Sequence, residues 1–108
     1  MKIDEFNSLN KEVIRECLKL LDLKGHDYTS GSEVEDALAN FKLVARNTGL
    51  TPLQVWSVYF HKHIDSIMTF VKKGELKSES IDSRIHDSIN YLLLLNGLIK
   101  EQINEKKL

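Results

Sequence analysis

Apolar residues recur along most of the chain with the period of an α-helix. The first such run extends from about Asp4 to Leu23 and ends before Gly25, a residue that commonly stops a helix. Its mostly apolar positions, three and four residues apart, are Ile3, Phe6, Asn10, Val13, Cys17 and Leu20. Strict alternation of apolar and polar residues, the mark of a half-buried strand, does not occur over a useful length. The pattern predicts an all-helical fold.

A second helix is predicted after a polar, turn-rich loop over residues 26–31. Ser32 and Glu35 match the capping box that opens many helices, and the pattern fades at residues 47–49. The apolar positions predicted to share one face are Val34, Ala37, Leu38, Phe41 and Val44.

The third helix has the clearest start in the chain. Thr51 can cap it, Pro52 suits its first position, Gln54 stands at the reciprocal capping position, and Gly74 ends it. A last helix begins at residues 78–80 and continues toward a tail at 105–107. Four helices joined by short loops predict one domain over residues 1–108, built like a four-helix bundle.

The third and fourth helices have apolar residues on two sides. The main stripe of the third contains Leu53, Trp56, Phe60, Ile64, Ile67 and Val71, and that of the fourth Ile81, Ile85, Ile89, Leu92, Ile99 and Ile103. Val55 and Val58 lie opposite the first stripe, and Tyr91, Leu94, Leu95 and Leu98 away from the second. Two apolar sides indicate two neighbours. We therefore predict a homo-oligomer, with a dimer as the default, against the alternative that scattered exposed apolar residues are ordinary.

Charge and hydropathy narrow the functional classes. The formal net charge of −1 gives no global attraction for polyanions, so generic nucleic-acid binding is not expected. No segment approaches the roughly 20 apolar residues of a membrane span, and residues 1–5 are polar where a signal peptide has an apolar core. We expect a cytoplasmic protein, in the host cytoplasm if a phage encodes it.

Two polar clusters interrupt the apolar pattern of the last two helices. Each cluster contains a basic and an acidic residue three positions apart, Lys62 with Asp65 and Arg84 with Asp87. Each of these pairs could form an ion pair on a solvated face. The second cluster continues to Asn90 and Tyr91 directly before four leucines. An asparagine beside a core stretch usually has a polar partner to satisfy, so a binding site is the competing interpretation.

Acidic residues near the start of the second helix offer possible metal ligands. Glu33, Asp36 and Asn40 share one face, and Asp87 could converge on them from the last helix. Glu33, Asp36 and Asp87 would then hold Mg²⁺, which prefers oxygen ligands. The alternative is that acids in a first turn only complement the helix dipole. Asp27 could likewise either cap a turn or, with Tyr28, contact a base or sugar.

Four short motifs follow one another along the chain: Lys24-Gly25-His26-Asp27-Tyr28, Asn40-Phe41, Lys62-His63, and Arg84 with Asp87-Ser88-Ile89-Asn90-Tyr91. In their order and spacing they resemble the nucleotide modification associated domain 1 family of phage and bacterial proteins. This family resembles in turn the MazG-like all-alpha nucleoside triphosphate pyrophosphohydrolases. The resemblance covers roughly residues 24–99. It implies a helical, oligomeric domain that handles nucleotides.

The resemblance also implies roles for individual residues. Those implied to bind the ligand are Asp27, Tyr28, Asn40, Lys62, His63, Arg84, Asn90 and Tyr91. Asp87 and Lys62 are implied in catalysis. Two departures stand against a complete enzyme: Asp65 replaces an expected second basic residue, and Asn90 replaces an acid of the paired carboxylates.

Three functional hypotheses follow. The first is nucleotide binding with magnesium-dependent pyrophosphohydrolysis of a nucleoside triphosphate, canonical or modified. The second is a non-catalytic protein that sequesters a nucleotide, such as a signalling nucleotide in host defence. The third is an interaction module whose two-sided helices dock a partner protein.

Overall fold

The computed structural model describes the backbone of residues 1–28 and 36–107 and the side chains of residues 1–24 and 36–106. Four helices make up this described part: α1 (Ile3–Tyr28), α2 (Ala39–Thr48), α3 (Pro52–Lys73) and α4 (Ile81–Lys107), with no strand among them. The prediction of an all-helical fold is therefore confirmed. None of the helices in the described ranges is long and apolar enough to cross a membrane.

The predicted ends of α3 are confirmed in atomic detail. The Thr51 hydroxyl accepts from the Gln54 amide at 3.1 Å, and the Gln54 side chain accepts from the Thr51 amide at 2.9 Å, which completes a capping box. Gly74 ends the helix in the left-handed conformation with φ 80°, and its amide donates to the Phe70 carbonyl at 2.7 Å. At both ends the signal is local in sequence, which explains why it could be recognised there.

Two predicted boundaries are wrong. Helix α1 does not stop at Gly25 but continues to Tyr28, so the backbone of residues 26–28 is helical and not a loop. Helix α2 begins at Ala39, and in the turn that precedes it the Asp36 carboxylate accepts from the Leu38 amide at 2.9 Å. The predicted capping box of Ser32 and Glu35 lies outside the described residues.

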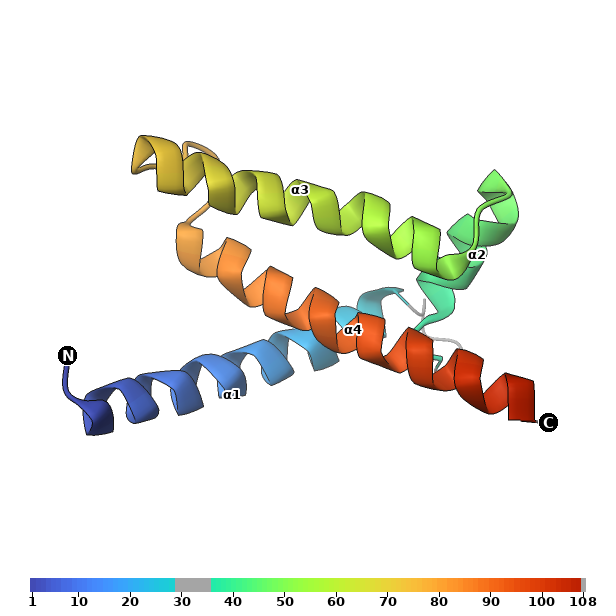
Figure 1. The fold of residues 1–108 in the computed structure, drawn as a ribbon, viewed down its shortest axis with the longest axis horizontal. Helices are drawn as coiled ribbons and strands as arrows, with labels where there is room; N and C mark the ends of the chain where they lie inside the picture. The colour runs from blue at the N-terminus through green and yellow to red at the C-terminus, as the bar shows by residue number, and fades with distance from the viewer. Residues whose placement is uncertain (29–35, 108) are drawn as a thin grey trace.

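Helix α4 is the central element of the fold. It runs beside α3 along much of its length, crosses the C-terminal half of α1, and has the start of α2 near its own C-terminal half (Figure 1). Trp56 links α3 to α4, because its indole N–H donates to the Tyr91 carbonyl on α4 at 2.7 Å.

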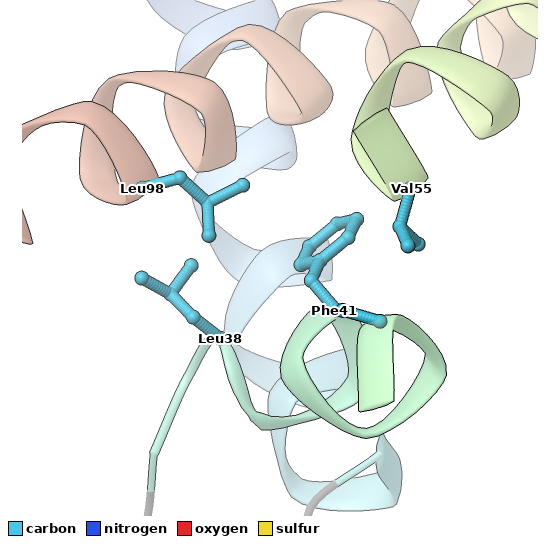
Figure 2. Close-up of a cluster of buried hydrophobic side chains, with 5 residues drawn as sticks. Leu38, Phe41, Val55 and Leu98 are labelled. Carbon is cyan, nitrogen blue, oxygen red and sulfur yellow. The ribbon is translucent and has the colours of Figure 1, made fainter. Parts of the chain in front are cut away.

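The hydrophobic core lies where α2, α3 and α4 meet. Leu38 and Phe41, at the start of α2, point toward Leu98 of α4 and Val55 of α3 (Figure 2). Val55 is only 2% exposed, so the second apolar side of α3, which led to the prediction of an oligomer, is covered at this residue within the protomer. The reason is that α2 packs against the side of α3 that carries Val55, a neighbour that the periodicity of α3 alone could not reveal.

On α4, too, the side that packs against the core is not the predicted main stripe. Leu98 is buried and Tyr91 and Leu94 pack against the core, whereas Leu92 on the predicted main stripe is 51% exposed. On α3, Val71 at the end of the predicted stripe is also largely exposed. A helical pattern thus identified the apolar sides correctly but not which of them the protomer itself covers.

Candidate functional site

All four helices contribute residues to one pocket of about 380 Å³. It lies beside the hydrophobic core, between the C-terminal half of α1, the start of α2 and the middle turns of α3 and α4. The residues that line it are Leu21, Lys24, Ala37, Asn40, Phe41, Tyr59, His63, Asp87, Asn90, Tyr91 and Leu94. The wall is therefore mostly apolar and aromatic with a few polar groups, the usual composition of a small-molecule site.

Three contacts between α1 and α4 hold one side of the pocket in place. The Asn90 side-chain amide donates to the Cys17 carbonyl at 2.9 Å, and the Cys17 thiol lies 3.8 Å from the His86 carbonyl as a weak donor. Lys24 forms an ion pair with Asp87 at 3.0 Å. Burial raises the pKa of the Cys17 thiol, and the side chain is fully buried, which fits a role in packing.

Two residues of the pocket wall have a buried polar atom without a hydrogen-bond partner among the described residues. These atoms are Nδ1 of His63 and the side-chain oxygen Oδ1 of Asn90. An unsatisfied buried polar atom costs about 1–3 kcal/mol, and each one in a folded protein calls for an explanation. A polar ligand in the pocket would supply the missing partners.

His63 is held in a neutral form by its surroundings. Burial lowers its pKa, and Arg84 and Lys24 lower it further, while Asp87 and Glu79 act in the opposite direction. Its ring packs on that of Tyr91 with centroids 4.6 Å apart. A neutral imidazole can donate from one nitrogen and accept at the other, which suits the recognition of an uncharged polar edge.

A second polar cluster lies outside the pocket lining. Lys42 joins the start of α2 to the C-terminal part of α4, with its ammonium 2.6 Å from Asp36 and 2.6 Å from Glu101. The hydrogen bond from Lys42 lowers the pKa of Asp36, and the hydrogen bonds to Asp36 and Glu101 raise the pKa of Lys42. This cluster is a partly exposed bridge between two helices.

The predicted magnesium ligands do not form a fitting donor set in the described part of the chain. Asp36 is occupied by Lys42 and by the Leu38 amide, and Asp87 by Lys24, so each carboxylate already balances an ammonium group. No group of three or more His, Cys, Asp or Glu side chains suited to a metal occurs among the described residues. Glu33 lies outside them.

The pocket brings together five of the residues that the sequence singled out. These are Asn40, His63, Asp87, Asn90 and Tyr91, from α2, α3 and α4. Lys62 is exposed and is not part of the lining. Arg84 pairs with Glu79 at 3.2 Å, and Asp87 pairs with Lys24 instead of forming the ion pair with Arg84 that the sequence allowed. The side chains of Asp27 and Tyr28 lie outside the described residues.

Sequence reasoning assigned no ligand-binding role to Lys24 or Tyr59. Lys24 follows Cys17 by seven residues on the apolar stripe of α1, and a charge at that point could have marked the site. Tyr59 carried no comparable signal, because an aromatic residue on an apolar helix is usually a core residue. Only the arrangement of α2 against α3 shows that its ring borders a pocket.

Comparison of the chain with protein-family models, with curated proteins and with solved structures found no match.

Proposed function

We propose that this pocket binds a nucleotide. The observation that carries the proposal is a pair of buried atoms, His63 Nδ1 and Asn90 Oδ1, that have no hydrogen-bond partner within residues 1–24 and 36–106 and lie on the wall of a pocket of about 380 Å³. That volume lies within the range of roughly 300–1,000 Å³ that small-molecule sites occupy. A ligand that fits must combine flat apolar surface with hydrogen-bonding edges, and a nucleobase does so.

The walls of the pocket supply both kinds of contact that a base requires. Phe41, Tyr59 and Tyr91 provide aromatic surface, with Phe41 packed edge-on against each tyrosine ring. The amide of Asn40 and the acceptor oxygen of Asn90 can pair with donors and acceptors on a base edge. The neutral ring of His63 adds a further hydrogen bond without the cost of burying a charge.

Lys24 is the basic group that the pocket offers to a phosphate. Its side chain is partly exposed, and its ammonium has three donors, of which the ion pair with Asp87 at 3.0 Å occupies one. Asp87 can accept from a sugar hydroxyl while it fixes the lysine in position. The pocket therefore provides separate groups for base, sugar and phosphate.

Binding without hydrolysis is the form of this function that the geometry favours. The described carboxylates Asp36 and Asp87 are each paired with a lysine, so the electrostatic arrangement suits a bound anion better than a divalent cation. The resemblance to the nucleotide modification associated domain 1 family also supports a nucleotide ligand. The alternative is magnesium-dependent pyrophosphohydrolysis with Asp87 and Lys62 as catalytic residues. A titration that also follows the fate of the nucleotide distinguishes this reaction from binding alone.

A calorimetric titration with a panel of canonical and modified nucleotides, with and without a chelator, tests the proposal. We expect at least one nucleotide to bind, to bind equally well with the chelator, and to be recovered intact by chromatography. Lys24→Met should weaken binding of the phosphorylated ligand but hardly change binding of the parent nucleoside, whereas Lys19→Met, on the exposed side of α1, should affect neither.

Two results would contradict this proposal. Absence of binding by every member of the panel would refute a nucleotide site. Release of pyrophosphate that requires magnesium, and that Asp87→Ala abolishes, would replace sequestration by the hydrolytic function.

A further inference from the structure

The apolar stripe of α1 is covered along only half of its length. We define the α1 stripe as Ile3, Phe6, Asn10, Val13, Cys17 and Leu20. Cys17 is fully buried against α4, whereas Ile3 on the same stripe is 78% exposed and all of residues 1–12 are exposed. Figure 1 shows the cause, since α1 crosses α4 and its N-terminal half projects away. The open half is thus the continuation of a surface that is already a helix-packing surface.

Helix α4 carries a second surface of the same kind. We define the α4 seam as Ile85, Ile89, Leu92, Asn96, Ile99 and Ile103. It lies on the side of α4 that faces away from the core residue Leu98, and four of its five apolar members are exposed. Both surfaces have the alternating three- and four-residue spacing of a coiled-coil seam. Each also has a single asparagine, Asn10 or Asn96, at an equivalent position of that repeat.

The surface area of the chain is too large for an isolated domain of its mass. A compact protein of 12.4 kDa exposes about 6,100 Å², whereas this chain exposes 8308 Å². The excess of about 2,200 Å² exceeds the roughly 800 Å² that each partner contributes to a standard stable interface. The radius of gyration agrees, at 16.1 Å against about 13 Å for a compact chain of this length.

We propose that a second copy of this chain covers both surfaces. The N-terminal half of the α1 stripe in one copy packs on the α4 seam of the other, and two-fold symmetry supplies the reciprocal contact. Matching heptad spacing allows the side chains to interdigitate, and a polar residue within such a seam selects one register and one oligomeric state. Asn10 and Asn96 have this role in the assembly.

The charges of α1 argue for a protein partner over a membrane surface. Residues 1–24 contain five acidic and five basic side chains, whereas a helix that lies on anionic lipid is rich in lysine and arginine. Self-association also explains why α4 has apolar residues on two sides, since one side packs in the protomer and the other would pack against the second copy.

Sedimentation equilibrium of the full chain tests this proposal. We expect a mass of at least twice 12.4 kDa, and we expect Leu92→Glu to weaken association by at least about tenfold. Leu43→Glu is the matched control, because Leu43 is similarly exposed on α2 but belongs to neither surface. It should leave the mass unchanged.

A second variant separates dissociation from unfolding. Asn96→Leu adds apolar contact to the α4 seam and removes the polar residue that selects one oligomeric state. The variant should therefore keep the helical circular dichroism signal, associate more tightly and form a broader distribution of oligomers. A wild-type chain that is a folded monomer at all loading concentrations would overturn the proposal. So would equal effects of Leu92→Glu and Leu43→Glu, unchanged association in Asn96→Leu, or a monomer that binds anionic phospholipid vesicles through α1.

Discussion

His63 combines partial burial, a ring contact and a nitrogen that has no hydrogen-bond partner in the described part of the chain. Desolvation is the largest influence on it and lowers its pKa below the ordinary value of 6.5. Its neighbour His61, two residues away on the same helix, is exposed. The two histidines therefore differ in environment while sharing an element, which makes them a natural experimental pair.

The lowered pKa predicts a pH dependence of stability. As the pH falls through 6.5, the unfolded chain takes up a proton that the folded chain resists. The stability associated with neutral His63 is therefore fully present above this pH and is lost as the pH falls toward the lower, folded-state pKa. Denaturant unfolding between about pH 8 and about pH 5 should show a smaller acid-side loss for His63→Gln than for wild type. His61→Gln should retain the wild-type slope, and an equal loss in all three proteins would contradict a buried neutral His63.

Asn90 shows what sequence reasoning can and cannot recover about a site. A mid-helix asparagine beside four leucines indicates an unmet polar requirement, and the structure confirms its burial and its bond to the Cys17 carbonyl. The sequence around Asn90 does not predict that its partner is Cys17, which is 73 positions away. The site is assembled by contacts between helices, so single-helix patterns identify its members but not their partners.

At the scale of the elements, helix ends are predictable where the signal is local. The Thr51, Pro52 and Gln54 start of α3 fixes its own geometry through two side-chain hydrogen bonds. Gly25, in contrast, does not end α1, because the helix continues through an isolated glycine at a cost of only about 1 kcal/mol. The contact between Lys24 and Asp87 of α4 fixes this part of α1 against its neighbour.

The capping box makes a direct prediction about α3. Thr51→Ala removes the acceptor for the Gln54 amide and should lower the free energy of unfolding by about 1 kcal/mol. Thr69→Ala is the control within the same helix, because the Thr69 hydroxyl donates only to the Asp65 carbonyl, which is already part of the helix. Denaturant unfolding of both variants checks the difference, and equal stabilities would show that the cap is dispensable.

At the scale of the whole molecule, the hydrophobic core and the candidate pocket share the same helices. The core residues Phe41 and Val55 hold α2 on α3, and Phe41 also borders the pocket. A ligand that bridged α1, α2, α3 and α4 in the proposed site would therefore stabilise the arrangement that creates the pocket. The pocket can be understood only at this scale, because each helix supplies just part of its lining.

Asn40 tests the central claim most directly, because it lines the pocket from α2 while Asn47 is exposed on the same helix. The measurement is a calorimetric titration of wild type, Asn40→Leu and Asn47→Leu with the nucleotide that wild type binds most tightly. We predict that Asn40→Leu weakens binding by about tenfold or more and that Asn47→Leu binds like wild type. Equal affinities in all three proteins, or no nucleotide binding by the wild-type chain, would contradict the proposal that this pocket is a nucleotide site.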